Sequence, residues 1–368
     1  MSRIFHGKVA LQQRVLPFYR APFFDLLAES CTAGLDVFAG EPRSSESIES
    51  ARRLEIARFH HAENIHFLSG AAYLCWQRNL LDWLDAVNPD ALIMEANPRY
   101  LASPAAIRRM HRQGKPVIGW GLGAPALQGV EALLRATSRG RFIRSFDGMI
   151  AYSDSGAQEY IREGIPAERI FVAPNAVARS RQGVSPSRKA PVGKANLLYV
   201  GRLQPRKRLD LLMQACSMLP ENLQPGLTII GDGPERQRLE EFAHTVYPAA
   251  VFTGTLMGEA LEPFFQRADL FVLPGTGGLA VQQAMSHALP VIVAEGDGTQ
   301  TDLVRESNGW HIVPGDLADL QRTLLEALSQ PEKLPDLGRE SFRIVCEEIN
   351  LEKMADVFLL AIQAVSAK

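Results

Sequence analysis

The chain has 368 residues, of which 46% are hydrophobic and 22% are charged, with 39 Lys and Arg against 41 Asp and Glu. That length is too great for one ordinary core and favours two domains. A net charge of −2 argues against a dedicated nucleic-acid binder. The four cysteines lie far apart and form no C-x-x-C pair, which indicates reduced structural thiols rather than a disulfide or zinc framework.

No membrane-spanning or secretory segment is evident. The first residues lack the continuous apolar run of a signal peptide, and no stretch approaches the roughly 18–20 apolar residues of a spanning helix. We expect a cytoplasmic protein that at most sits on a membrane surface. Arg108, Arg109, Arg112 and Lys115 lie on or beside one predicted helix, and residues 135–144 add four arginines. They predict peripheral contact with anionic lipid, with two solvated helix faces as the alternative.

Short apolar runs alternate with helix-period segments, which is the pattern of parallel βαβ units. In the first half the predicted strands are 8–13, 35–40, 64–69, 91–96, 116–121, 148–153 and 169–174. The predicted helices include 22–31, 104–113 and 155–164.

Residues 175–195 are rich in Pro, Gly, Ser and basic residues and lack periodicity, so they predict a linker. It would separate an N-terminal domain, residues 1–174, from a C-terminal domain, residues 196–348. Residues 349–368 predict a helix that packs back on the N-terminal domain.

The alternation resumes after the linker. The predicted strands are 196–201, 227–232, 250–254, 270–275, 290–295 and 309–314. Two α/β halves predict two facing, doubly wound parallel sheets, with ligands in the cleft at the carboxyl ends of the strands.

Basic residues follow the first strand of the second half. Gly201 and Arg202 end this strand, and Lys207 precedes the next helix. Two cations at a strand–helix junction suit a diphosphate, because charge-assisted hydrogen bonds neutralise its oxygens. The alternative is a solvated basic loop, which is what we expect of Arg206 and Arg208.

A glycine cluster ends the strand at 270–275. Gly275, Gly277 and Gly278 turn the chain, and a helix is predicted to begin near Leu279. Glycines let backbone amides approach a ligand, and a helix N-terminus favours anions, so this turn predicts an anion site. It matches neither G-x-G-x-x-G nor a P-loop, and an ordinary tight turn is the alternative.

Six segments in this order resemble family 4 of the retaining glycosyltransferases (glycosyltransferase group 1), which have the GT-B fold. They are FDGMIAYSDSGAQEYIREGIPAERIFVAPNAV, VGRLQPRKRLDLL, IIGDGPERQRLEEFA, VFTGTL, ADLFVLPG and GLAVQQAMSHALPVIVAE. The resemblance spans roughly residues 145–330, and the first third of the chain shares only the alternation. It implies two facing Rossmann-like domains, of which the N-terminal one binds the acceptor and the C-terminal one the nucleotide sugar.

The same resemblance implies the site residues. Arg202 and Lys207 would hold the donor diphosphate and stabilise its charge during transfer. The implied donor contacts are Gly201, Arg202, Lys207, Gly254, Thr255, Leu256, Gly275, Thr276, Gly277, Gly278, Leu279 and Gln283.

Two glutamates usual in the family are missing. Gly275 and Gln283 stand at their positions, eight residues apart. Gln283 can still bond a ribose hydroxyl, whereas Gly275 cannot recognise the donor sugar. We hypothesise that Thr276, Glu295 or Asp302 compensates.

The acceptor side is less clear, because residues 119–125 lack the histidine that many relatives carry near the reacting sugar. His111 lies upstream in a predicted helix, where a surface position is expected. Glu95, Asn97 and Arg99 follow an apolar strand whose carboxyl end would face the cleft. Glu95 is therefore the predicted catalytic carboxylate on the acceptor side. The alternative is that Glu95 caps a loop and pairs with Arg99.

Arg14, Tyr19 and Arg20 lie where the family usually has a glycine-rich turn. They either bind the acceptor or only cover the first helix.

The absence of any D-x-D indicates a metal-independent reaction. The resemblance to family 4 implies a retaining enzyme that moves a hexose-type sugar from a nucleotide-diphosphate donor to a glycan or lipid-linked acceptor, in bacterial surface polysaccharide or glycolipid synthesis. The nucleotide sugar is a co-substrate, and no cofactor and no nucleic acid are expected. The alternatives are a non-catalytic sugar-nucleotide-binding or partner subunit with this fold and, less favoured, a sugar-nucleotide epimerase.

Overall fold

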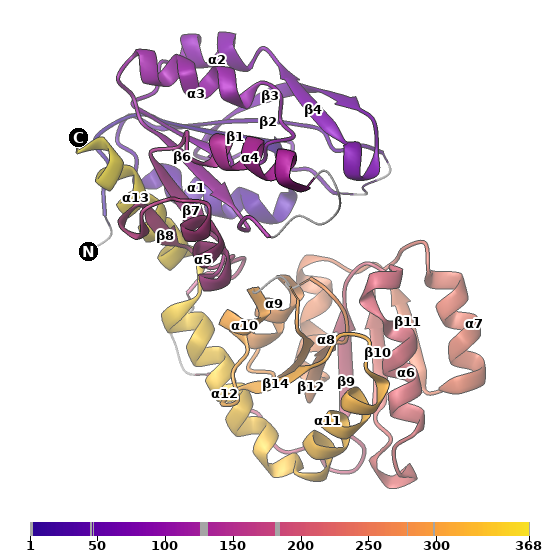
Figure 1. Cartoon of the computed structure of the whole chain (residues 1–368). Coiled ribbons are helices and arrows are strands. Elements are labelled where there is room, and N and C mark those ends of the chain that lie inside the picture. The colour runs from indigo at the N-terminus through magenta and orange to yellow at the C-terminus, as the bar shows by residue number, and fades with distance from the viewer. Residues whose placement is uncertain are drawn as a thin grey trace. The chain divides into compact units, whose positions relative to one another are not determined.

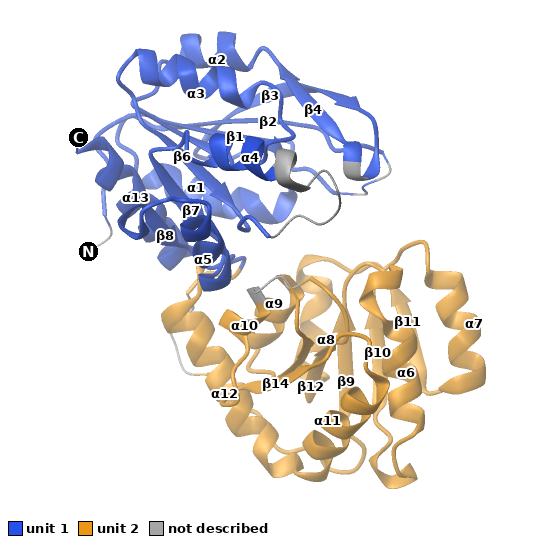
Figure 2. Ribbon diagram, in the orientation of Figure 1, with its two compact units in different colours: residues 1–177, 351–368 blue, residues 178–350 orange. Residues whose placement is uncertain are grey.

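The computed structural model describes residues 3–44, 46, 48–125, 132–180, 185–277, 279–296 and 299–367. It divides the chain into two compact units (Figures 1 and 2). Unit 1 holds residues 1–177 and 351–368, and unit 2 holds residues 178–350. The predicted linker at 175–195 is thus divided between the two units, and its residues 181–184 lie outside the described residues.

The sheet of unit 1 has the strand order β4-β3-β2-β1-β5-β6-β7-β8. Its strands are β1 (Val9–Val15), β2 (Leu35–Gly40), β3 (Arg58–Phe67), β4 (Leu74–Arg78), β5 (Ala91–Glu95), β6 (Val117–Gly121), β7 (Gly148–Ala151) and β8 (Ile170–Val172). Its helices are α1 (Ala21–Glu29), α2 (Leu80–Val87), α3 (Ser103–Arg112), α4 (Ala132–Ile143), α5 (Asp154–Arg162) and α13 (Leu351–Ser366). Neighbouring strands are parallel, except that β3 and β4 are antiparallel.

Central strands of unit 1 are apolar because helices cover both faces. In β5, Ile93 packs with residues of α1 and α13, whereas Leu92 and Met94 pack with residues of α2 and α3. Successive side chains of a strand point to opposite faces, so a strand buried on both faces carries an unbroken apolar run.

The edge of this sheet differs from the sequence prediction. The strand predicted at 64–69 is wrong in extent, because β3 begins at Arg58, and β4 was not predicted. Much of β3 is only partly buried and includes polar residues such as His60 and His61. A half-exposed edge strand carries a short apolar signal, so its pattern is easily missed.

The last helix, α13, completes one core of unit 1. The ring of Phe358 is 0% exposed, and its centroid lies 4.9 Å from those of Phe23 in α1 and Trp120 in β6. This helix returns from the end of unit 2 and buries a face that unit 1 would otherwise expose to solvent.

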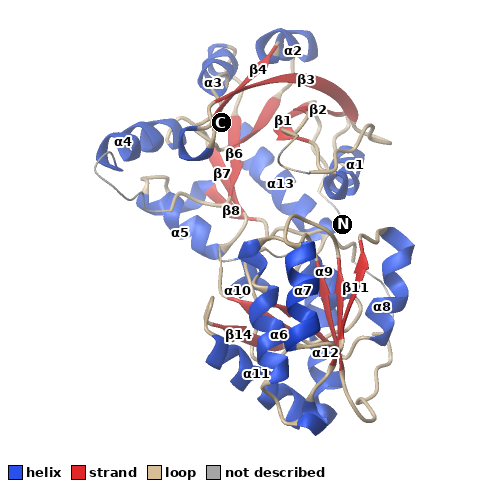
Figure 3. Ribbon diagram, turned by 90° about the vertical axis from the view of Figure 1, so that its right-hand side faces the viewer, coloured by secondary structure: helices blue, strands red, loops and turns tan. Residues whose placement is uncertain are grey.

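Unit 2 has a parallel sheet with the strand order β11-β10-β9-β12-β13-β14 and helices on both faces (Figure 3). Its strands are β9 (Asn196–Val200), β10 (Gly226–Ile230), β11 (Ala250–Gly254), β12 (Leu270–Leu273), β13 (Val291–Ala294) and β14 (Gly309–Ile312). Its helices are α6 (Leu209–Ser217), α7 (Arg236–Val246), α8 (Glu262–Arg267), α9 (Leu279–Ser286), α10 (Thr299–Leu303), α11 (Leu317–Ser329) and α12 (Leu334–Arg343). The six predicted strands and the helix predicted to begin near Leu279 are confirmed.

In both units one strand lies where the strand order reverses. β1 lies between β2 and β5 in unit 1, and β9 lies between β10 and β12 in unit 2. Open α/β sheets bind ligands beyond the carboxyl ends of the strands at this point. The segments that follow β1, β5, β9 and β12 are therefore the candidates for ligand binding.

Replacing Phe358 by alanine is expected to lower the free energy of unfolding by about 3–5 kcal/mol, because the cavity opens between Phe23 and Trp120. Urea unfolding followed by tryptophan fluorescence measures this loss. The matched control is Leu360→Ala on the same helix, where the leucine is 37% exposed and the expected loss is below about 1 kcal/mol. Equal losses in both variants would contradict the packing role given to α13.

Candidate functional site

Residues 201–207 connect β9 to α6. On one side they lie close to the turn that follows β10, because two residues of that turn are glycines. A Cβ atom on Gly231 would lie 2.0 Å from the carbonyl oxygen of Gly201, and one on Gly233 would lie 2.2 Å from that of Leu203. The amide of Gly201 also donates to the carbonyl of Ile230 at 2.9 Å. Only glycine permits such a close backbone approach, so β10 fixes the position of the 201–207 segment.

The turn that follows β12 fixes the other side of this segment. A Cβ atom on Gly275 would lie 2.1 Å from the carbonyl oxygen of Arg206 and 2.7 Å from the carbonyl carbon of Lys207. The amide of Thr276 donates to that same carbonyl of Arg206 at 3.2 Å. The absence of the family glutamate at position 275 therefore agrees with the structure. The backbone of Arg206 and Lys207 occupies the space that a glutamate side chain would need.

Lys207 lies against the turn that begins at Gly275 and includes Gly277, called the glycine turn below. It is only 8% exposed, and its Nζ donates to the carbonyl of Thr276 at 2.5 Å. The same Nζ would lie 2.3 Å from a Cβ atom on Gly277. A fixed ammonium group thus faces the turn ahead of α9, where backbone amides and the positive end of the helix dipole favour an anion.

Arg202 and Arg206 belong to the same segment. Arg202 is half-buried and its carbonyl accepts from the hydroxyl of Tyr199 at 3.2 Å. Arg206 is exposed but is more than a solvated residue, since its Nη1 donates to Thr276 Oγ1 at 3.2 Å. The structure therefore gathers three basic residues of one loop at the carboxyl edge between β9 and β12.

The other predicted donor residues lie along the same edge of unit 2. Gly254 ends β11 with a φ of 80°, and its carbonyl accepts from the amide of Gly231 at 2.8 Å. Thr255 is exposed and Leu256 is half-buried. Leu279 and Gln283 are both half-buried in the first turns of α9. Gly278 lies outside the described residues.

The sequence did not point to Gln300. This residue is 0% exposed, and its Nε2 donates to the carbonyl of Gly277 at 3.0 Å. It positions the glycine turn from α10. Of the three residues suggested to compensate for the missing glutamate, Thr276 and Glu295 are exposed and Asp302 is half-buried.

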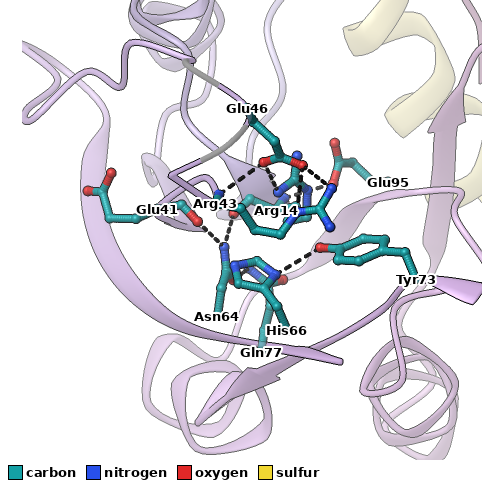
Figure 4. Close-up of polar contacts among 9 residues, drawn as sticks. All are labelled: Arg14, Glu41, Arg43, Glu46, Asn64, His66, Tyr73, Gln77 and Glu95. Atoms are coloured by element: carbon teal, nitrogen blue, oxygen red, sulfur yellow. Dashed lines mark hydrogen bonds and ion pairs between the residues drawn. The ribbon is translucent and has the colours of Figure 1, made fainter. Parts of the chain in front are cut away.

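In unit 1, Arg14 and Glu95 meet at the carboxyl ends of β1 and β5 (Figure 4). The carboxylate of Glu95 accepts from the amide of Arg14 at 2.7 Å, and the amide of Glu95 donates to Gln12 Oε1 at 3.3 Å. Burial raises the pKa of the Glu95 carboxyl, and hydrogen bonding and charge at Arg14 offset only part of that effect. A carboxyl with a raised pKa at a strand end is a group suited to acid–base work.

An ion-pair cluster that the sequence did not predict surrounds Arg14. Its guanidinium lies 2.8 Å from the carboxylate of Glu46, which also binds Arg43 at 3.0 Å. Burial acts to lower the pKa of Arg14, but the hydrogen bond and the charge of Glu46, together with the other acidic groups nearby, outweigh it, so this pKa is raised. A pocket of about 580 Å³ lies beside this cluster, with Arg43 in its lining.

The remaining acceptor-side candidates have different surroundings. Arg20 is 5% exposed and bonds to Asn175 and to the carbonyl of Ala176 at 3.4 Å, with the ring centroid of Trp120 5.2 Å away. These contacts favour the alternative that this segment covers the first helix. Tyr19 is half-buried beside Arg20.

Asn97 and Arg99 form a turn after β5. Asn97 is half-buried and its Oδ1 accepts from the amide of Arg99 at 3.1 Å, while the side chain of Arg99 is exposed. His111 is exposed, as predicted, and lies 2.9 Å from Asp147.

The basic helix α3 presents Arg108 and Arg112 to solvent, whereas Arg109 pairs with Asp85 at 2.8 Å. None of the described helices combines the length and apolar character needed to cross a membrane. Peripheral contact with anionic lipid stays a prediction.

In the part of the chain that the structure describes, His, Cys, Asp and Glu side chains form no group of three that could hold a metal ion. The predicted independence from metals and cofactors rests on the sequence alone.

Comparison with known proteins identifies the second unit. Residues 180–343 match the family model described as glycosyl transferases group 1. Residues 180–343 form a group 1 glycosyltransferase domain. The basic loop and the glycine turn, on either side of the β9–β12 edge, both belong to this domain.

The chain spans between 29% and 56% of the length of the curated relatives it matches first. It is 37% identical over 153 residues to the sulfoquinovosyl transferase SQD2 of Arabidopsis thaliana, which covers 40% of this chain and 29% of that protein. It is 31% identical over 225 residues to a GDP-mannose-dependent alpha-mannosyltransferase of Mycobacterium tuberculosis, covering 56% of each.

Solved structures match nearly the whole chain. The Anabaena protein HepE in complex with UDP has a TM-score of 0.71 at 15% identity, covering 95% of this chain and 97% of HepE. The lipopolysaccharide outer core galactosyltransferase WaaB has a TM-score of 0.68 at 16% identity, covering 95% and 99%. These matches establish the fold: the chain consists of two Rossmann-like units of the GT-B fold.

Gly275→Ala is expected to destabilise the glycosyltransferase domain by about 1–3 kcal/mol, because the new Cβ overlaps the backbone of Arg206 and Lys207. Thermal and urea unfolding measure the loss. The matched control is Gly226→Ala at the other end of the sheet, where the nearest atom to the new Cβ is the movable Oδ1 of Asn196 at 3.1 Å. A Gly275→Ala protein as stable as this control would disprove the close contact.

The raised pKa of Glu95 predicts a pH-dependent stability. Above its ordinary pKa of 4.5, the folded protein retains a proton that the unfolded chain has released. The free energy of unfolding should therefore decline as pH rises from 4.5 through the raised pKa, and Glu95→Gln should flatten this decline. Urea unfolding at a series of pH values tests this, with Glu29→Gln, at an exposed position, as the matched control. An unchanged slope in Glu95→Gln would refute it.

Proposed function

We propose that this chain is a retaining, metal-independent glycosyltransferase that moves a hexose-type sugar from a nucleotide-diphosphate donor to a glycan or lipid-linked acceptor. The observation that carries the proposal is the fixed position of Lys207 against the glycine turn at the β9–β12 edge of a group 1 glycosyltransferase domain. Relatives named as mannosyltransferases and a sulfoquinovosyl transferase support transfer of a six-carbon sugar.

In this proposal the donor diphosphate lies between the 201–207 segment and the start of α9. Arg202 and Lys207 neutralise its oxygens, and the amides of the turn around Gly277 bond to them. HepE was crystallised with UDP and the mycobacterial relative is GDP-mannose-dependent, which supports a nucleoside diphosphate as the ligand here. The backbone from Gly254 to Leu256 then contacts the nucleobase, and Gln283 bonds the ribose.

The chemical work of the donor site is electrostatic. Negative charge develops on the leaving diphosphate, and cations already held in position stabilise it without reorganising. Lys207 fits this role, because its hydrogen bond to Thr276 fixes the ammonium group before any ligand arrives. With protein cations supplying the charge, the reaction needs no bound metal.

Recognition of the sugar differs from the usual family pattern in this proposal. Gly275 offers no carboxylate, and its neighbours leave no room for one. Backbone groups of the turn, positioned by Gln300, take over this contact. In unit 1, Glu95 is the proposed acceptor-side carboxylate. It lies at the β1–β5 edge and bonds to Arg14, which belongs to the same ion-pair cluster as Arg43 of the pocket lining.

Arg202→Ala and Lys207→Ala are each expected to lower turnover by about 100-fold or more, since each removes charge stabilisation from the leaving group. A thermal-shift screen of sugar nucleotides first selects the donor, because a bound donor stabilises the fold by mass action. Nucleoside diphosphate release at saturating donor then gives turnover, and NMR of the product gives its anomeric configuration. Arg238→Ala is the matched control, because this arginine is itself exposed and pairs with its helical neighbour Glu235.

Near-normal turnover in both variants at saturating donor would overturn the donor-site assignment. Donor binding by the wild-type protein without any turnover would instead favour the non-catalytic binding subunit. A product with inverted anomeric configuration would contradict only the proposal that the enzyme is retaining.

A further inference from the structure

In unit 1, two arginines bind the carboxylate of Glu46 in the way that arginines bind the acid group of a ligand (Figure 4). The Glu46 carboxylate accepts from Arg14 Nη1 at 2.8 Å and from Arg43 at three points: the backbone amide at 3.0 Å, Nε at 3.2 Å and Nη2 at 3.0 Å. Forked guanidinium groups match the geometry of carboxylates and phosphates, and such charge-assisted bonds are the stronger ones in proteins. The two arginines thus form an anion-binding arrangement that is filled from within the chain.

Contacts that do not involve Glu46 also hold the two arginines. The amide of Arg14 donates to Glu95, and its carbonyl accepts from Asn64 Nδ2 at 2.7 Å. The guanidinium carbons of Arg43 and Arg14 lie 4.4 Å and 6.0 Å from the ring centroid of Tyr73. Because of these contacts, the arginines would remain near their positions if another acid group replaced Glu46.

The ring of Tyr73 is itself fixed. Its hydroxyl lies 2.9 Å from His66 Nδ1, and the two rings stack with centroids 5.9 Å apart. Burial lowers the pKa of His66, and the charge of Arg14 acts in the same direction. The imidazole is therefore uncharged around neutral pH and can bond a neutral hydroxyl group.

Space for the rest of a ligand adjoins Arg43. The pocket of about 580 Å³ is lined by Arg43, Asn64 and His66 and also by Glu41 and Glu63, so the acid group of a ligand would have to lie at its Arg43 end. Ligand pockets typically measure roughly 300–1,000 Å³. Glu46 itself is reachable from solvent, since 18% of its side chain is exposed. The site also lies at the carboxyl end of β1, where the strand order of unit 1 reverses.

We propose that Arg14 and Arg43 bind an acid group of the acceptor, a carboxylate or a phosphate, and that Glu46 occupies this site as an internal substitute. On binding, the acid of the ligand replaces the Glu46 carboxylate, and the neutral part of the ligand lies in the pocket beside Asn64 and His66. The acceptor would then carry an acid group, as an acidic glycan or a phosphorylated carrier does. That the ligand is the acceptor of a sugar rests on the proposed function, whereas the binding of an acid group does not.

Isothermal titration of the full chain with inorganic phosphate, methyl glucuronide and neutral methyl glucoside tests this. Glu46→Gln keeps the shape of the side chain but removes the charge that competes for Arg14 and Arg43. It is expected to raise the affinity for at least one acid by about ten-fold or more. The gain should vanish in Glu46→Gln/Arg43→Gln. The matched control is Glu55→Gln, which removes an exposed carboxylate paired with Arg53 and should bind as wild type does.

A gain for phosphate alone assigns a phosphorylated acceptor, and a gain for the glucuronide alone assigns an acidic sugar. No gain for either acid, an equal gain for methyl glucoside, or a gain that persists in the double variant overturns the inference. If Glu46→Gln does not fold, wild type is compared with Arg43→Gln at high acid concentration. Only wild type should then gain thermal stability, and equal shifts in both proteins overturn the inference.

Nucleoside diphosphates titrated into the same samples report on unit 2. Nucleotide binding without acid binding overturns the anion site and leaves the proposed function intact. Acid binding without nucleotide binding supports the anion site and contradicts the proposed function.

Discussion

Close backbone contact around residues 201–207 is the constraint on which the carboxyl edge between β9 and β12 depends. Carbonyl groups of this segment occupy the positions where side chains of Gly231, Gly233 and Gly275 would begin. The turns that follow β10 and β12 thereby fix the segment from both sides, and the ammonium group of Lys207 bonds to the carbonyl of Thr276 in the turn before α9. Fixing the backbone in advance is how a site stabilises charge without a later cost of reorganisation. The position of the ammonium group is therefore set by folding rather than by ligand binding.

The equivalent edge of unit 1 is built in a different way. There the geometry depends on side chains. The guanidinium group of Arg14 binds the carboxylate of Glu46, the carboxylate of Glu95 accepts from the backbone amide of Arg14, and the guanidinium groups of Arg14 and Arg43 lie near the ring of Tyr73. Side-chain ion pairs can exchange partners, whereas carbonyl-to-glycine contacts cannot. The β9–β12 edge of unit 2 is therefore fixed by backbone contacts, whereas the ion pairs at the edge of unit 1 can rearrange.

Much of the fold could be predicted from the sequence, because buried parallel strands carry unbroken apolar runs. β4 and the start of β3 could not, since a partly exposed edge strand lacks this signal. The assignment of Arg202 and Lys207 to a donor diphosphate came from the spacing of the basic residues and from the family resemblance, and it stays a prediction. The ion pair between Glu46 and Arg14 was not predicted, because it joins a segment without periodicity to the end of a strand elsewhere in the chain. Arg20 was a candidate for acceptor contact, but only the structure could show that its guanidinium is buried against Asn175.

The contact at Gly275 also limits the order in which this site can be altered. The sequence shows only that a carboxylate is missing, whereas the structure shows that the carbonyl of Arg206 now occupies its space. Reintroducing glutamate by a single substitution would force two loops apart and displace Lys207 along with them. Any attempt to engineer the usual sugar contact must therefore reshape residues 205–207 first.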